Sequence, residues 1–191
     1  GTTGMEKTKD LILTSAMKKF ARYGFKKTSL DDIVRDVKIS KGTIYIYFKN
    51  KEDLFRQSAE IVVNSMLSSL KANISPENNT KENIVSFTCG QIQFIRNYIA
   101  EEGSTIEIFK EVKENVHLLS TFRKRMAGLI QEILETGIER NFIKITSPHK
   151  TAVIIIQILE QFELRWTEMS RKDSDKEIHK LFELIFHGIE E

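Results

Sequence analysis

The sequence has one cysteine, two prolines and no long uninterrupted apolar run. A lone Cys89 excludes a disulfide framework or a cysteine-based zinc site within one chain, so we expect a reducing, cytoplasmic location. The longest apolar stretch, residues 152–159, is interrupted by Gln157, whereas a membrane-spanning helix needs about 20 apolar residues. The N-terminus has no signal-peptide pattern, and we expect Gly1 to Gly4, which precede Met5, to be a cloning remnant. We therefore expect no membrane partner.

Signatures of catalysis are also missing. The four histidines, at positions 117, 149, 179 and 187, have no metal-ligand spacing such as H-E-x-x-H. There is no glycine-rich phosphate loop and no nucleophile-elbow pattern. We expect no catalytic residue, no metal and no cofactor, which leaves an enzyme as the weaker alternative.

The net charge of +2 hides an uneven distribution. Residues 1–51 carry twelve basic and five acidic side chains, whereas the remainder carries 17 basic and 22 acidic ones. A basic N-terminal segment on an otherwise acidic chain indicates that residues 1–51 contact a polyanion. A lysine-rich surface that is merely solvated is the alternative.

Apolar residues recur with the 3.6-residue period of helices, and no sustained strand-type alternation occurs. We therefore predict an all-α fold. Gly24 suits a left-handed cap at the end of the first helix. The predicted helices cover about 6–23, a segment after Ser29, Ser40 to about Tyr47, 51–72, 81–101, 104–113, 117–140, 148–170 and 174–189.

Two short helices separated by residues 37–39 form a helix-turn-helix candidate. Ser29 and Ser40 are candidate N-caps, and Asp32 completes a capping box with Ser29. On a helical wheel Ile44 and Phe48 face the core, whereas Gly42 and Ile46 point away from it. An exposed glycine costs a helix about 1 kcal/mol relative to alanine, which makes sense if another surface must approach closely.

A duplex is the partner that this exposed face fits, because the major groove admits a helix. Lys41 and Thr43 can reach bases or phosphates, and Ile46 can touch a thymine methyl group. For Lys41 the alternative is a merely solvated charge. Phosphate contacts are expected from a second set of side chains, namely Thr28, Ser29, Tyr45, Tyr47 and Lys51. The alternative is plain packing for Tyr45 and Tyr47 and capping alone for Thr28 and Ser29.

The stretch from Thr28 to Leu54, with Ile39-Ser40-Lys41-Gly42-Thr43-Ile44-Tyr45-Ile46-Tyr47-Phe48 at its centre, resembles the DNA-binding domain of the TetR (tetracycline repressor) family. The resemblance covers about residues 8–55. It implies a helix-turn-helix DNA-binding domain over residues 5–51 and a helical ligand-binding and dimerisation domain over residues 52–191. It implies a homodimer on a palindromic operator, with Lys41, Gly42, Thr43, Tyr45 and Ile46 facing the groove and Thr28, Ser29, Tyr47 and Lys51 holding phosphates. Ser40 belongs to the same DNA-binding set.

This chain has Lys38 at a turn position where the family commonly has glycine. If the turn keeps its shape, Lys38 takes a left-handed conformation that costs about 1–2 kcal/mol. We predict a positive φ at Lys38.

The C-terminal part has no comparable motif, and the resemblance implies an effector pocket inside it and dimerisation through the last two helices. Aromatic residues and methionine around an isolated glutamine suit an apolar pocket with a polar anchor, although plain core is the alternative. The candidate ligand-binding residues are Phe87, Gln91, Phe94, Tyr98, Phe122, Met126, Phe162 and Trp166. Glu160 and Gln161 could anchor a ligand or line a dimer seam.

The last two predicted helices are apolar on several sides, which favours burial against a second copy, with intramolecular burial as the alternative. Their stripes comprise Ala152, Ile155, Ile156, Leu159, Phe162 and Trp166, and Ile178, Leu181, Phe182, Ile185 and Ile189.

The sequence thus predicts a sequence-specific DNA-binding transcriptional regulator. Repression is favoured over activation because a dimer on a promoter blocks polymerase, and a small apolar effector is expected to release it. A helical module that uses its helix-turn-helix for protein contacts is the rival, and the salt dependence of duplex binding separates the two.

Overall fold

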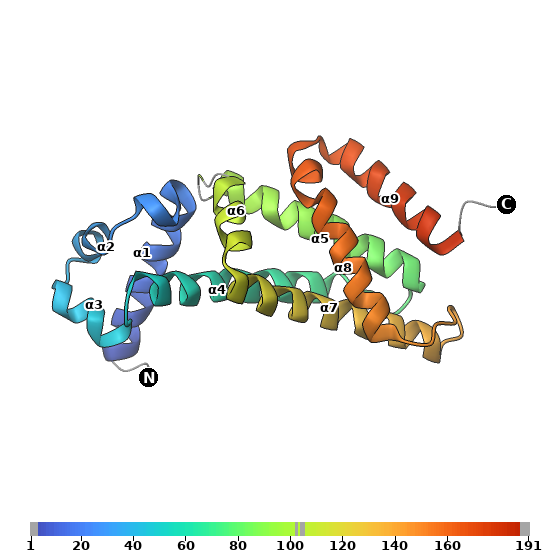
Figure 1. Ribbon diagram of the computed structural model, residues 1–191, viewed down its shortest axis with the longest axis horizontal. Coiled ribbons are helices and arrows are strands. Elements are labelled where there is room, and N and C mark those ends of the chain that lie inside the picture. Colours follow the sequence, from blue (N-terminus) through green and yellow to red (C-terminus); the bar gives the residue numbers. More distant parts are fainter. Residues whose placement is uncertain (1–3, 102, 104–105, 188–191) are drawn as a thin grey trace. The chain divides into compact units, whose positions relative to one another are not determined.

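The computed structural model describes residues 4–101, 103 and 106–187, and every regular element in those ranges is an α-helix (Figure 1). The predicted all-α fold is confirmed. The helices are α1 (Gly4–Lys27), α2 (Leu30–Val37), α3 (Lys41–Tyr47), α4 (Lys51–Ala72), α5 (Thr80–Glu101), α6 (Ile106–Glu114), α7 (Val116–Glu139), α8 (Pro148–Glu168) and α9 (Arg171–His187).

The chain forms two compact units. Unit 1 comprises residues 1–64 and 98–119, and unit 2 comprises residues 65–97 and 120–191. Helices α4, α5 and α7 therefore contribute residues to both units. The predicted functional boundary after residue 51 falls inside unit 1 and stays a prediction.

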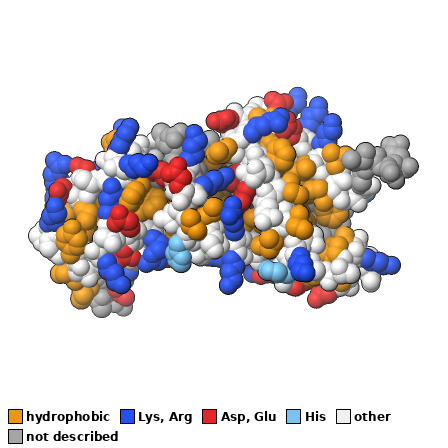
Figure 2. Space-filling view, in the orientation of Figure 1, with side chains coloured by type: hydrophobic (Ala, Val, Ile, Leu, Met, Phe, Trp, Pro, Cys, Tyr) orange, Lys and Arg blue, Asp and Glu red, His pale blue; other side chains and the backbone are white. Residues whose placement is uncertain are grey.

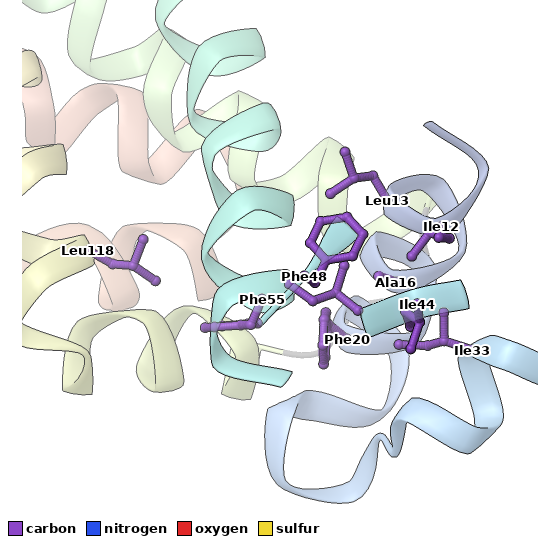
Figure 3. Close-up of a cluster of buried hydrophobic side chains, with 10 residues drawn as sticks. Ile12, Leu13, Ala16, Phe20, Ile33, Ile44, Phe48, Phe55 and Leu118 are labelled. Atoms are coloured by element: carbon purple, nitrogen blue, oxygen red, sulfur yellow. The ribbon is translucent and has the colours of Figure 1, made fainter. Parts of the chain in front are cut away.

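The core of unit 1 is built from the periodic apolar faces of its short helices. Ile12 and Ala16 of α1 meet Ile33 of α2 and Ile44 of α3, and all four are buried (Figure 3). Phe20 and Phe55 pack edge to face with ring centroids 5.1 Å apart. Burial of this apolar surface, at roughly 25 cal/mol per Å², holds α2 and α3 in place against α1.

Helix α1 is interrupted at Gly24, close to its predicted end. Gly24 has φ 80° and ψ 168°, a positive φ with an extended ψ. The predicted left-handed helical cap is wrong, because the ψ is extended and the chain breaks direction there before one further helical stretch. An added Cβ at Gly24 would lie 3.1 Å from a carboxylate oxygen of Glu111. Both the backbone and the neighbour therefore favour glycine.

Helices α8 and α9 of unit 2 form a hairpin whose turn is held by Arg96 of α5. The Arg96 guanidinium donates hydrogen bonds to the backbone oxygens of Trp166, Thr167 and Met169 and to Ser174 Oγ. The carbonyls at the end of α8 lack helical partners, so this cation satisfies them and complements the helix dipole.

Most of the predicted α8 stripe is buried, namely Ala152, Ile155, Ile156, Leu159 and Trp166, and Phe162 is half-buried. In α9 Ile178 and Phe182 are buried and Leu181 is half-buried, whereas Ile185 is exposed. Ile189 lies outside the described residues. None of the helices in the described ranges is long and apolar enough to cross a membrane.

Candidate DNA interface

The turn between α2 and α3 has the shape that the sequence predicts. Lys38 has φ 59° and ψ 44°, a left-handed conformation, and its backbone N–H donates to the Val34 carbonyl. The Ile39 N–H donates to the same carbonyl at 3.2 Å. The predicted positive φ at Lys38 is confirmed, so the end of α2 is closed without a glycine and α3 leaves at a sharp angle.

Helix α3 begins where Ser40 caps it. The Thr43 N–H donates to Ser40 Oγ at 3.1 Å, and the hydroxyls of these two residues lie 2.7 Å apart. The inward side chains are Ile44 and Phe48, which are almost fully buried. The predicted orientation of α3 is therefore confirmed, and its other face is free to meet a partner.

The exposed face of α3 has Gly42 at its centre. A Cβ built on Gly42 would meet only Ser40 Oγ, at 3.7 Å, which is ordinary contact, and the φ of Gly42 is not in the left-handed region. Nothing inside the described chain therefore requires a glycine. Ile46, one turn further along, is 70% exposed. A helix face that combines a bare backbone with an exposed isoleucine fits a groove in another molecule.

Lys41 precedes Gly42 and is held by an acid of α2. Its Nζ lies 2.9 Å from Asp31 Oδ1 and 3.1 Å from Asp31 Oδ2. The hydrogen bond to Asp31 raises the pKa of Lys41, so the side chain is a cation at neutral pH. It lies at the surface beside the glycine-bearing face, where a nucleic acid would meet it.

The capping box at the start of α2 is formed as predicted. The Asp32 N–H donates to Ser29 Oγ at 3.1 Å, and the Ser29 N–H donates to Asp32 Oδ2 at 3.1 Å. The Ser29 hydroxyl, the Ser29 N–H and Arg35 together lower the pKa of Asp32 to about 2. Ser29 is exposed, so its position suits a phosphate contact.

Thr28 is placed differently from Ser29. Only 3% of Thr28 is exposed, and its single hydroxyl hydrogen is within reach of two carbonyls, that of Gly24 at 2.8 Å and that of Lys19 at 3.2 Å. The Thr28 hydroxyl thus ties the end of α1 to the start of α2 and faces away from any surface phosphate. A phosphate contact through this hydroxyl is disfavoured.

The remaining predicted contacts surround α3. Tyr45 is 50% exposed, whereas Tyr47 is half-buried and packs on the core beside Phe48. Lys51 Nζ lies 4.3 Å from the centroid of the Phe25 ring, a cation–π contact that directs the ammonium. Tyr45 and Lys51 present polar groups near α3, and the packing alternative gains weight for Tyr47. Lysine and arginine side chains are spread over unit 1 on the face drawn in Figure 2.

The candidate ligand residues fall into different surroundings. Phe87, Gln91 and Met126 are buried, and Phe122 is half-buried. Phe94 lines a hollow of about 390 Å³. Cys89, Asn97, Arg171 and Asp175 line the same hollow. Burial raises the pKa of the Cys89 thiol to about 12, with a smaller contribution from Asp175.

Phe162 and Trp166 are stacked with centroids 5.2 Å apart and line a second hollow, of about 600 Å³, between α8 and α9. The Trp166 indole N–H donates to Glu177. Tyr98 follows on α5 in the part that belongs to unit 1. Glu160, a candidate ligand anchor, instead forms a two-pronged ion pair with Arg123 at 2.7 Å.

Two acidic side chains of unit 1 make contacts that the sequence does not predict. Asp31 is ten positions from the lysine that it binds. Glu111 of α6 accepts a hydrogen bond from the Phe25 N–H at 2.6 Å, across 86 positions. Asp31 could be suspected as an acid in a basic segment, but no local pattern indicates Glu111.

A capped, outward-facing short helix on a three-helix core, with a sharp turn before it and cations beside it, defines a helix-turn-helix DNA-binding protein. Residues 12–57 match the family model described as bacterial regulatory proteins, tetR family. The uncharacterized HTH-type transcriptional regulator YhgD of Bacillus subtilis is 29% identical over 174 residues, which cover 88% of each chain.

The biofilm operon icaADBC negative transcriptional regulator IcaR of Staphylococcus epidermidis is 27% identical over 118 residues, 59% of this chain and 63% of that protein. A solved structure of a TetR-family regulator from Syntrophomonas wolfei has the same fold, with a TM-score of 0.75, 20% identity and 97% coverage of both chains. The chain is therefore similar to TetR-family helix-turn-helix transcriptional regulators, in sequence over residues 12–57 and in fold over nearly its whole length.

Proposed function

We propose that the protein is a dimeric repressor that binds a palindromic operator through the exposed face of α3 and leaves it when a small apolar ligand binds in unit 2. The observation that carries the DNA-binding part is Gly42, whose missing side chain has no reason inside the described chain. Repression is supported by the similar IcaR, which is named a negative regulator.

Dimerisation is proposed through α8 and α9. Ile154, Leu184 and Ile185 are 54%, 47% and 40% exposed, and hydrophobic side chains gather over α8 on the face drawn in Figure 2. Exposed apolar surface of this kind marks interaction sites. A two-fold dimer would present two copies of α3, and operator binding requires them about 34–36 Å apart, one helical turn of DNA.

The ligand site is proposed around Gln91. This residue is a buried polar side chain of α5, only 5% exposed. A ligand with a polar group on an apolar body would hydrogen-bond to its amide. A ligand that binds one spacing of the α3 pair better than the other shifts the population off DNA.

Selection of bound sequences from random duplexes tests the DNA-binding part. We expect a palindrome, and affinity for it that falls steeply between low and moderate salt because phosphate contacts release counterions. Gly42→Glu should abolish this binding and leave the dimer intact. Loss of the dimer in this variant, or binding that ignores salt, would contradict the assignment.

Sedimentation of Ile185→Lys tests the dimer surface, with Val116→Lys as the matched control. Both positions are exposed, Val116 at 81%, but only Ile185 lies on α9. We expect Ile185→Lys to be monomeric and Val116→Lys to remain dimeric. Selection of bound duplexes, repeated in the presence of amphiphilic ligands with the wild type and with Gln91→Leu, tests the ligand site.

A further inference from the structure

Asp31 places a negative charge beside the face of α3 that meets DNA. Its side chain is 60% exposed, and both carboxylate oxygens bind the Lys41 ammonium, at 2.9 and 3.1 Å. An acid at this place repels phosphates, so its presence beside a polyanion-binding face needs a reason.

The other acids of α2 have roles within the fold. Asp32 caps the helix with Ser29, and Asp36 accepts a hydrogen bond from the Ser15 hydroxyl at 2.5 Å. Asp31 stands in the first turn of α2, where an acid favours the helix dipole, but its hydrogen bond and ion pair in the described chain go to Lys41 alone. The contact with Lys41 is therefore the feature of Asp31 through which it can affect DNA binding.

Lysine is a compact charge on a flexible stem. An unrestrained Lys41 would reach the nearest phosphate of any duplex, a contact that positions a protein but carries no sequence information. The carboxylate of Asp31 competes with phosphate for this ammonium and fixes it beside Gly42. The remaining N–H donors of the ammonium are then available to base edges in the groove, such as the O6 and N7 acceptors of guanine.

We propose that Asp31 is a positioning residue that sets the sequence specificity of this protein by holding Lys41 toward the base edges and away from the phosphates. The inference rests on the proposed DNA-binding function. It predicts that the acid lowers affinity for random DNA and raises discrimination in favour of the operator.

The test measures binding of the full chain to the selected operator and to a scrambled duplex over a range of salt concentrations. In Asp31→Asn, we expect affinity for the scrambled duplex to rise several-fold and its log–log salt slope to steepen by about 0.9, the value for one more phosphate contact. The ratio of operator to scrambled affinity should fall about tenfold, within the range that one base contact supplies. Asp31→Glu should restore most of the ratio.

Asp10→Asn is the matched control. Asp10 is an exposed acid of the same unit, and its replacement changes the net charge equally without touching Lys41. Equal affinity ratios in Asp31→Asn and Asp10→Asn would overturn the inference, because the effect would then be general electrostatics. An effect of Asp31→Asn that persists in a Lys41→Met background would also overturn it.

DNA binding by the wild type distinguishes failure of the proposed function from failure of the inference about Asp31. If it binds no duplex in a salt-dependent manner, the proposed function fails, and the inference fails with it. If it selects an operator but Asp31→Asn keeps the same discrimination, only the role of Asp31 is refuted. The thermal unfolding temperatures of Asp31→Asn and Asp10→Asn should match that of the wild type, since exposed ion pairs contribute little to stability.

Discussion

Gly42→Ala should stabilise the fold and weaken DNA binding at the same time. The added methyl group would meet only Ser40 Oγ, at 3.7 Å, so it creates no clash within the described chain. Alanine is favoured over glycine in a helix interior by about 1 kcal/mol. Because α3 has only seven residues, we expect about half to all of that gain in the free energy of unfolding.

The DNA affinity should change in the opposite direction. If the backbone of Gly42 lies against the duplex, the methyl group must push α3 outward and lengthen the neighbouring contacts. We expect at least a tenfold loss of operator affinity, which corresponds to about 1.4 kcal/mol. Urea unfolding of the full chain measures the first effect, and titration of a labelled operator measures the second.

Gly128→Ala provides the matched control. Gly128 lies inside α7, and a Cβ built on it would have no neighbour within 4 Å. This variant should gain a similar stability and bind the operator as the wild type does. If Gly42→Ala binds the operator with unchanged affinity, Gly42 does not lie against DNA and the proposed orientation of α3 is refuted.

Three further predictions concern stability. Lys38→Gly should raise the free energy of unfolding by about 0.5–1 kcal/mol, because it relieves a left-handed lysine but gives the unfolded chain more freedom; a lower urea midpoint would contradict this. Arg96→Met should cost about 3 kcal/mol, because it leaves the carbonyls at the end of α8 without a donor, and unchanged thermal unfolding would argue against the Arg96 contacts. The pKa of Asp32 is about 2 in the folded protein and 3.8 ordinarily. Its contribution to stability is therefore present above pH 4 and is lost as the pH falls towards 2. The urea midpoint of Asp32→Asn should lie below that of the wild type at pH 6, and the two midpoints should converge near pH 2.

The local features of this fold could be predicted because their causes are local. The starts of α2 and α3 are explained by a serine whose side chain accepts a hydrogen bond from the backbone N–H three positions later. In α2, a short acid at that later position completes the cap. The four-residue spacing of Ile44 and Phe48 decides which face of α3 is buried. Even the strained Lys38 follows from a turn that must close in a few residues. Each of these predictions depends on atoms that are near one another in the sequence.

The rest depends on residues brought together by tertiary packing. Glu111 contacts the Phe25 N–H only because α6 packs against α1, and the sequence carries no sign of that pairing. Thr28 looked available to phosphate because it precedes an N-cap, but its hydroxyl is buried against Gly24. Aromatic stripes such as that of Phe87 look the same whether they line a pocket or fill a core, so the ligand site could not be separated from packing.

The segment from Lys38 to Ile46 combines three local costs to folding. Lys38 is left-handed, Gly42 weakens a short helix, and Ile46 leaves 70% of its surface in water. Hydrogen bonds to the Val34 carbonyl offset the first cost in part, but no contact inside the described chain requires Gly42 to be glycine or covers the exposed part of Ile46. Natural sequences tolerate such clustered conflicts at functional sites. If this segment binds a duplex as proposed, the three features have one explanation: the turn directs α3 outward, the glycine lets the backbone approach DNA, and DNA covers the isoleucine.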